Sequence, residues 1–211
     1  TSSHTFVATG AAIHHSGAKP VLVDIGEDHN IDANLIENMI TDKTKAIMPV
    51  HLNGRLCDMD KITAIANKYN LLIIEDAAQA LGATFKGKKA GSFGLAGCFS
   101  FYPAKLLGAY GDAGAVVTSD NALAENISYL RNHGRMDNGD VSGWAYNTRL
   151  DNLQAAILQI KFKQFPNWIK RRREIASIYN NGLENISNLR LPNPPVESGD
   201  FFDVYQNYEI E

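Results

Sequence analysis

The sequence predicts an α/β fold, a three-layer αβα sandwich with a mostly parallel sheet. Two apolar runs, residues 46–50 and 71–74, do not alternate with polar residues, as expected of strands buried on both faces. Residues 58–69 between them repeat apolar side chains at helical spacing, and a helix between two strands is typical of a parallel pair. The 211 residues are 45% hydrophobic and 20% charged, which supports a buried core and excludes a disordered chain.

The first forty residues predict a helix, a strand and a second helix. Residues 5–15 form the first helix, and the β-branched run 19–24 forms the strand. Asp32 can cap the second helix, which runs through Ile40. Its expected apolar face comprises Leu35, Ile36 and Met39.

The middle of the chain predicts the remaining strands. The helix over 58–69 should bury Met59, Ile62, Ile65 and Ala66. The glycine-rich stretch 82–92 predicts a hairpin, and 98–101 and 113–118 predict two further strands.

The last third predicts three helices and a domain boundary. The helices cover 123–133, 151–163 and a segment from Pro166 to about Leu183. The second should bury Leu153, Ala156, Ile157 and Ile160. Because prolines and Gly199 follow, we expect a large domain over 1–184, a linker over 185–200 and the start of a small domain over 201–211. The alternating run 204–210 predicts its first strand.

Charge and composition exclude several classes of protein. The net charge of -3 leaves no positive surplus for nucleic acid or an anionic membrane. No apolar stretch is long enough to span a bilayer. Cys57 and Cys98 form no disulfide framework, so a reducing, cytoplasmic location is expected. A chain that opens on Thr1 and stops within a predicted strand is expected to be an excerpt of a longer protein.

Acidic residues follow the apolar strand 71–74. Ligands of open parallel sheets bind beyond the carboxyl ends of the strands, so Asp76 is placed to meet a cofactor. Capping of the next helix is an equally good explanation for Asp76 alone. Glu75 and Asp76 point to opposite faces of an extended strand, and Gln79 shares the side of Asp76 in a helix that starts there.

Lys105 has apolar and aromatic neighbours and is followed by Gly108, Gly111 and Gly114. Partial burial disfavours the charged form of a lysine, which makes its amine a usable nucleophile toward carbonyl compounds. Taken alone, an exposed lysine in a glycine-rich loop is the simpler reading.

Two other motifs carry less weight. Residues 82–89 fit GxxxxGK but lack the final Ser or Thr, and they read as a hairpin, so a nucleotide hydrolase is disfavoured. The histidines show no metal-ligand spacing, and no metal site is expected.

Four residues together match the needs of an enzyme that uses pyridoxal 5'-phosphate. Such an enzyme requires a lysine for a Schiff base, a carboxylate at the pyridine nitrogen, a phosphate donor and a flat group against the ring. Lys105, Asp76, Ser100 and Phe6 can fill these roles in that order.

The sequence is also similar to a known family. The resemblance lies in seven ordered blocks, residues 3–9 (SHTFVAT), 49–54 (PVHLNG), 75–80 (EDAAQA), 91–94 (GSFG), 99–105 (FSFYPAK), 111–114 (GDAG) and 146–150 (YNTRL). It points to the DegT/DnrJ/EryC1/StrS sugar aminotransferases, which are pyridoxal-phosphate enzymes of fold type I.

The resemblance implies a role for each site residue. Lys105 is the Schiff-base lysine and proton carrier, and Asp76 is the partner of the pyridine nitrogen. Gln79 binds the phenolic oxygen of the ring, Ser100 binds the phosphate, and Phe6 stacks on the ring. Asn147 reaches the phosphate in the neighbouring subunit of a homodimer that shares its active sites.

The implied reaction transfers an amino group from an amino acid, with glutamate expected, to the keto sugar of a nucleotide-linked deoxysugar. Similar dehydratases carry histidine at the position of Lys105, so this lysine favours amino transfer over dehydration. A catalytically silent binding or regulatory protein is a third possibility, which the presence of Lys105 and Asp76 disfavours. Family members also extend beyond both ends of this chain, so we expect a large domain truncated at both ends.

Overall fold

The computed structural model describes residues 1–136 and 138–211. Its helices are α1 (Val7–His15), α2 (Ala33–Ile36), α3 (Met59–Tyr69), α4 (Asn121–Leu130), α5 (Asn152–Phe162) and α6 (Phe165–Leu183), with short 3-10 turns η1 (Glu37–Met39) and η2 (Leu52–Gly54). Its strands are β1 (Ala46–Ile47), β2 (Leu72–Asp76), β3 (Thr84–Phe85), β4 (Lys88–Lys89), β5 (Ala96–Ser100), β6 (Gly114–Val117) and β7 (Phe201–Phe202).

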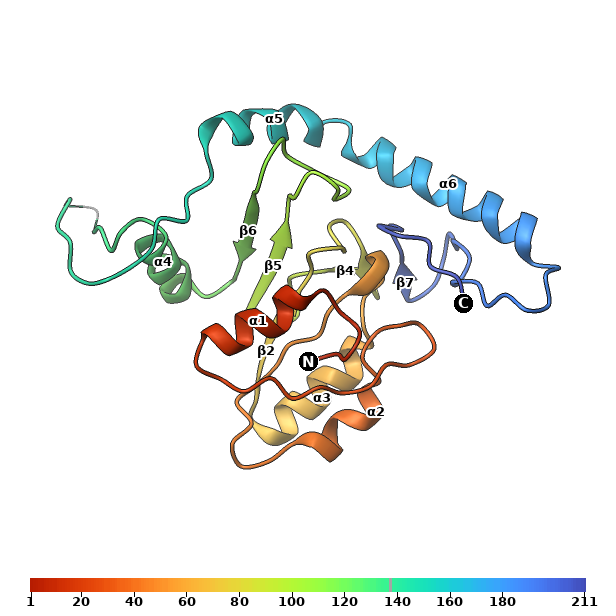
Figure 1. Ribbon diagram of the computed structural model, residues 1–211, viewed down its shortest axis with the longest axis horizontal. Coiled ribbons are helices and arrows are strands. Elements are labelled where there is room, and N and C mark those ends of the chain that lie inside the picture. The colour runs from red at the N-terminus through yellow and green to blue at the C-terminus, as the bar shows by residue number, and fades with distance from the viewer. Residues whose placement is uncertain (137) are drawn as a thin grey trace.

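The main sheet has the strand order β1-β2-β5-β6. β2 lies between β1 and β5 and is parallel to both, whereas β6 runs antiparallel to β5 at one edge. The predicted α/β class with a mostly parallel sheet is confirmed. Figure 1 shows α5 and α6 following one another along one side of the molecule, and α4 set apart from the sheet.

α3 crosses from β1 to β2 and carries the predicted apolar face. The side chain of Asp58 accepts a hydrogen bond from the backbone N–H of Lys61 at 3.1 Å, and Asn70 ends the helix in the left-handed conformation with φ of 52°. The four residues that the spacing assigns to the core are all buried: Met59, Ile62, Ile65 and Ala66.

Near the N-terminus one prediction is wrong and another is confirmed in part. Residues 19–24 do not form a strand, because only Val23 pairs, through an isolated bridge to Ser2, while Val21 and Leu22 are exposed. The helix from Asp32 to Ile40 is instead the single turn α2 followed by η1. Asp32 does cap it, accepting from the N–H of Asn34 at 2.9 Å.

The predicted strand over 46–50 is interrupted. β1 ends at Ile47, and pairing resumes only at the isolated bridge between Val50 and Asp76. Pro49 lies in the gap and has no N–H to donate, although its carbonyl accepts from the N–H of Asp76 at 2.9 Å.

The glycine-rich stretch forms the predicted hairpin of β3 and β4. Lys86 and Gly87 both have positive φ, 50° and 77°, as a two-residue hairpin turn requires. This segment opens no helix, so it lacks the context of a phosphate-binding loop.

The predicted strand over 204–210 is wrong. The strand near the C-terminus is β7, which pairs with β3, and Tyr205 turns out of the extended conformation with φ of 52°. Val204 is fully buried in the same core as α3, and its N–H donates to the carbonyl of Gly54 at 3.0 Å. Arg173 of α6 is buried and donates to the carbonyl of Asp203 at 2.8 Å. The segment that follows the prolines is therefore packed against the preceding residues.

The predicted apolar face of α5 does not face the core. Of the four predicted residues, Leu153 and Ile160 are 72% and 68% exposed, Ala156 is exposed as well and Ile157 is half-buried. Leu158 is the buried residue of α5. The sequence identifies the helix and its apolar stripe, but not the direction in which the stripe points.

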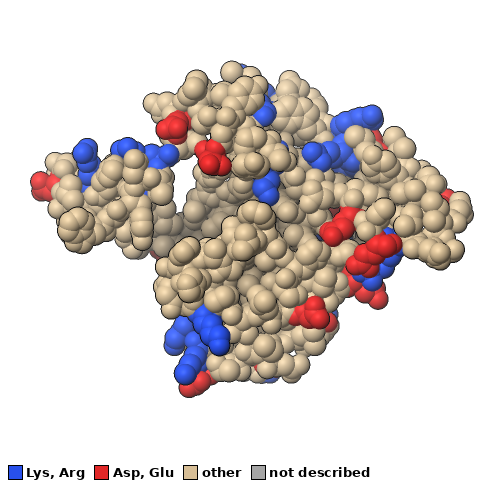
Figure 2. All heavy atoms as spheres, in the orientation of Figure 1, with Lys and Arg blue, Asp and Glu red and all other residues tan. Residues whose placement is uncertain are grey.

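On the face shown in Figure 2, charged side chains form a few small, separate groups on a surface that consists mostly of other residues. A hollow separates the part that contains α4 from the remainder of the molecule in this view. None of the described helices combines the length and apolar character needed to span a membrane.

Glu75 is fully buried at the end of β2 and binds four hydrogen-bond donors. Its Oε1 accepts from the backbone N–H groups of Phe93 and Gly94 at 2.6 and 2.8 Å. Its Oε2 accepts from the N–H of Gly91 at 2.7 Å and lies 3.0 Å from Nε2 of His51. Burial opposes ionisation, but the His51 hydrogen bond and these amides outweigh it and lower the pKa of Glu75.

The tautomer of His51 follows from its other nitrogen. The N–H of Cys57 donates to Nδ1 at 3.2 Å, so Nδ1 carries no proton and Nε2 donates to Glu75. His51 thereby joins the chain after β1 to the end of β2.

We predict that Glu75→Gln lowers the free energy of unfolding by about 2 to 4 kcal/mol at neutral pH. Both oxygens of Glu75 accept hydrogen bonds, and in glutamine one of them is replaced by an NH₂ group that would point at a donor. A lowered carboxyl pKa stabilises the fold above the ordinary value of about 4.3, and this stabilisation is lost as the pH falls through the folded-state pKa. The difference between wild type and variant should therefore shrink below about pH 4, measured by urea unfolding. Glu125→Gln, on the exposed face of α4, serves as the control. Equal stability of Glu75→Gln and wild type at pH 7 would contradict this role.

Candidate functional site

Asp76 is held at the carboxyl end of β2 by two donors. Its Oδ2 accepts from the hydroxyl of Thr9 at 2.7 Å, and its Oδ1 accepts from the N–H of Ala78 at 3.2 Å. The Thr5 hydroxyl lies 2.8 Å from that of Thr9, so it donates to Thr9 in turn. The carboxylate is only partly buried, so it has a fixed orientation and remains accessible.

Lys105 lies in the connection between β5 and β6. Its own N–H donates to the carbonyl of Tyr102 at 2.8 Å, and the following residues Leu106 and Leu107 are buried. Gly108 is required here, because a Cβ would lie 2.3 Å from the carbonyl oxygen of Pro103. The chain on either side of the lysine is therefore fixed.

The amine of Lys105 is half-buried, and the charge of Asp76 affects its pKa. Partial burial lowers the pKa of Lys105, and the negative charge of Asp76 acts in the opposite direction. The charge of Asp76 thus acts on Lys105, although β2 and the β5–β6 connection carry the two residues separately, and their roles toward a cofactor stay predictions.

Gln79 and Ser100 each use one polar function in a hydrogen bond and have another without a partner among the described residues. Oε1 of Gln79 accepts from the N–H of Asn53 at 2.6 Å, so its amide NH₂ group stays available. The hydroxyl of Ser100, at the end of β5, accepts from the N–H of Tyr102 at 3.2 Å and keeps its own hydrogen to donate.

Among the residues that the structure describes, neither Phe6 nor Asn147 forms a side-chain hydrogen bond or ion pair with another site residue. Phe6 is the residue before α1, one turn before Thr9, and it is 73% exposed. Asn147 is exposed and pairs with Asn132 in the segment between α4 and α5. Their predicted roles stay predictions.

Two residues of the site were not identified from the sequence. Thr9 orients Asp76, and its only sequence signal is its position four residues after Thr5, which places both hydroxyls on one side of a helix. Asn53 orients Gln79 and has a positive φ of 57°, a conformation that asparagine tolerates.

This set of side chains fits pyridoxal phosphate. An oriented carboxylate, an amine with a lowered pKa, a free amide and a free hydroxyl lie on neighbouring segments beyond the strands of a parallel sheet. The fold and these side chains are similar to those of the α/β domain that binds pyridoxal phosphate in aminotransferases. The chain belongs to the DegT/DnrJ/EryC1/StrS aminotransferase family, whose model matches residues 1–209.

Individual relatives agree with this family. A Geobacillus stearothermophilus protein named "Pleiotropic regulatory protein" is 44% identical over 211 residues, which are 100% of this chain and 56% of that protein. The dTDP-3-amino-3,6-dideoxy-alpha-D-galactopyranose transaminase of Aneurinibacillus thermoaerophilus is 50% identical over 193 residues, 90% of this chain and 52% of the enzyme. The chain therefore spans about half the length of the curated relatives it matches.

A solved structure shares the fold and contains a cofactor. The NtdA protein of Bacillus subtilis, with bound PMP, aligns with a TM-score of 0.86 and 36% identity, covering 100% of this chain and 48% of that one. A member of the same fold at this level of identity thus holds the amine form of the cofactor.

We predict that Lys105 reacts faster with amine-acylating reagents than an exposed lysine such as Lys43 when both are labelled below pH 10. The reason is that the pKa of Lys105 is lowered, so more of its amine is neutral. Asp76→Asn removes the negative charge that raises this pKa, so the pKa of Lys105 should fall further. Competitive labelling against pH, read by peptide mass spectrometry, measures both effects. Asp42→Asn, at an exposed turn, is the control. A Lys105 pKa that rises in Asp76→Asn would disprove the proximity of the two groups.

Proposed function

We propose that this chain is the cofactor-binding part of a pyridoxal-phosphate-dependent aminotransferase that transfers an amino group from an amino acid, with glutamate expected, to a nucleotide-linked keto sugar. The observation that carries the proposal is the pairing of the half-buried Lys105 amine with the oriented carboxylate of Asp76. A structural lysine at the surface would need neither partial burial nor a fixed carboxylate nearby.

Each site residue has a role toward the cofactor that follows from its free atoms. Asp76, fixed by Thr9, would accept from the protonated pyridine nitrogen, and the free amide of Gln79 would donate to the phenolic oxygen. The hydroxyl of Ser100 would donate to the phosphate, and the exposed ring of Phe6 would stack on the cofactor. The cofactor supplies an electron sink that permits cleavage of a bond at the carbon bearing the nitrogen.

Lys105 is the residue that binds the cofactor and moves protons. Its lowered pKa leaves more of the amine neutral near physiological pH than in an ordinary lysine, and only the neutral amine can attack a carbonyl or accept a proton. Removal of the proton from the substrate carbon and its return are both assigned to Nζ of Lys105. The same residue disfavours the alternative of a dehydratase, since that reaction is associated with histidine at this position.

The substrate class rests on relatives. The Aneurinibacillus thermoaerophilus protein is named as a transaminase of a dTDP-linked amino sugar, which supports a nucleotide sugar as substrate here. The donor glutamate, the cytoplasmic location and the domain limits 1–184, 185–200 and 201–211 stay predictions.

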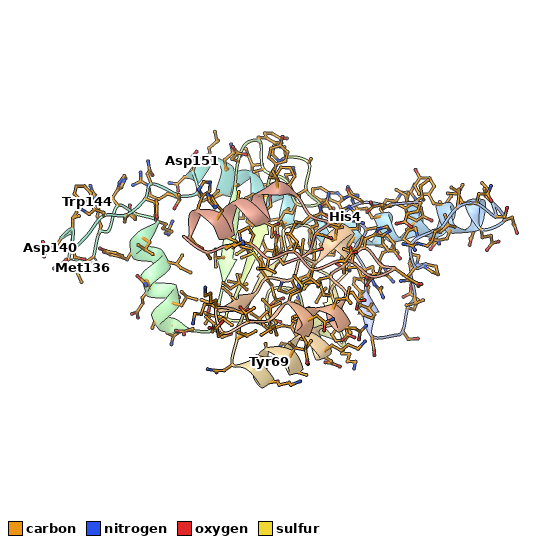
Figure 3. All side chains as sticks on the ribbon, turned by 60° about the horizontal axis from the view of Figure 1, so that its bottom comes forward. His4, Tyr69, Met136, Asp140, Trp144 and Asp151 are labelled. Carbon is orange, nitrogen blue, oxygen red and sulfur yellow. The ribbon has the colours of Figure 1, made fainter. Side chains whose placement is uncertain are left out.

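A homodimer is also proposed. The outward stripe of α5 adds Leu153 and Ile160 to the fully exposed Trp144 and the exposed Tyr146, both close to Asn147 in the sequence. Exposed apolar side chains in such number mark interaction surfaces, and a second copy of the chain that covers them would bring Asn147 to a neighbouring site. Figure 3 shows Trp144 on the part of the molecule that extends away from the body.

We predict that Lys105→Ala lowers the rate of amino transfer by about a thousandfold or more while the far-UV circular dichroism spectrum is unchanged. Borohydride reduction in the presence of pyridoxal phosphate should label Lys105 in the wild type, as located by peptide mass spectrometry. Lys86→Ala, in the exposed hairpin turn, is the control and should keep full activity. Normal turnover by Lys105→Ala, or no label on a folded wild type, would overturn the assignment, and the second result would favour a catalytically silent regulatory protein.

We further predict that Leu153→Glu combined with Ile160→Glu converts the dimer to a monomer, because two charges would be buried in the interface. Light scattering after size-exclusion chromatography measures the mass, and Met39→Glu, on η1, is the matched control. A variant that stays dimeric would show that this stripe is not the interface.

A further inference from the structure

The side chains of His4, His29 and Glu209 converge on one point outside the proposed cofactor site. One potential ligand atom from each lies within 4.8 Å of the others, and no other such group of His, Cys, Asp or Glu occurs among the described residues. His4 precedes α1, His29 lies in the turn between residues 26 and 31, and Glu209 follows β7. Figure 3 shows His4 near the start of α1, well away from Trp144.

The positions of the Glu209 carboxylate and of the two imidazole rings suit the binding of an ion. Oε2 of Glu209 accepts from the side-chain amide of Asn53, while Oε1 faces Nε2 of His4 at 3.8 Å. The two imidazole rings lie edge to face with centroids 5.8 Å apart. An oriented carboxylate oxygen next to two ring nitrogens is what a metal ligand set with an outer hydrogen-bond partner looks like.

His29 is the second, independent indication. The residue is only 8% exposed, and its Nδ1 lies 3.4 Å from Oε1 of Glu211. A histidine that binds a metal commonly has a carboxylate at its other ring nitrogen, and Glu211 occupies that place at Nδ1 and leaves Nε2 for a ligand. His29 also has a positive φ of 63°, so the backbone holds this side chain in place in an unusual conformation.

We propose that His4, His29 and Glu209 form a binding site for a divalent transition metal ion, with Zn²⁺ as the best match. Two imidazoles and one carboxylate are the ligand set that Zn²⁺ takes when one position stays open to water. Tetrahedral bonds of about 2.0 to 2.1 Å need ligand atoms about 3.3 Å apart. The present atoms lie within 4.8 Å of one another, so they must move closer on binding. His4 and Glu209 can move, since their side chains are 43% and 34% exposed.

A cavity adjoins the three proposed ligands, and an ion bound there would connect distant segments of the chain. A cavity of about 550 Å³ is lined by His29 and Glu209, by the acidic residues Asp28 and Asp32 and by Arg55 and Arg190, so an ion can reach the ligands from this cavity. A bound ion would tie the segment after β7 to the start of α1 and to the 26–31 turn. The three ligands come from distant parts of the chain, which is why no metal-ligand spacing is visible in the sequence. The site does not depend on the proposed amino transfer.

Calorimetric titration of the full-length, tag-free protein with ZnCl₂ tests the proposal. We expect one Zn²⁺ per chain for the wild type, a rise in melting temperature on binding, and affinity reduced by more than about a hundredfold in His4→Gln and in Glu209→Gln. Both residues are partly exposed, so these variants should fold even where His29→Gln does not. The absorption spectrum of the Co²⁺-loaded protein should show tetrahedral coordination.

The adjacent histidines of α1 provide the matched control. The rings of His14 and His15 lie 5.8 Å apart at an exposed helix end. The variants His14→Gln and His15→Gln should bind Zn²⁺ like the wild type. Absence of stoichiometric binding in the folded wild type would overturn the proposal. So would undiminished binding in His4→Gln and Glu209→Gln, or binding that is lost in the His14 and His15 variants.

Discussion

The buried carboxylate of Glu75 fixes the edge of the sheet at which the site is assembled. It binds three backbone amides of the loop that leads into β5 and the imidazole of His51, which follows β1. An ionised group without water must have all of its acceptor positions filled, so each donor has only one acceptable place. The chain after β1, the end of β2 and the entry to β5 are thereby joined at a single residue.

The neighbouring acids Glu75 and Asp76 have different roles in this arrangement. Because successive side chains of a strand point to opposite faces, Glu75 faces the loop while Asp76 faces α1 and meets the hydroxyl of Thr9. Gly94 permits the loop to approach, since a Cβ there would lie 2.3 Å from the carbonyl oxygen of Ile73. Glu75 therefore has a structural role, and Asp76 remains accessible for chemistry.

Asn53 links the proposed cofactor site to the proposed metal site. Its backbone N–H donates to Gln79, and its side-chain amide donates to Glu209. Its left-handed conformation and the following Gly54 allow the segment around Val204 to pack closely, because a Cβ on Gly54 would lie 2.8 Å from that side chain. The residues after β7 thus contribute to the same side of the domain as the cofactor-binding residues.

The sequence alone determined the α/β class, the extent of α3 and the position of the hairpin, because local periodicity, capping and turn residues act over a few positions. It could not reveal that the apolar stripe of α5 faces outward, since a pattern defines a face but not its partner. Only the tertiary structure decided that residues 204–210 leave the extended conformation at Tyr205. It alone also brought Thr9 to Asp76 and gathered His4, His29 and Glu209, because contacts between distant segments depend on packing that no local pattern records.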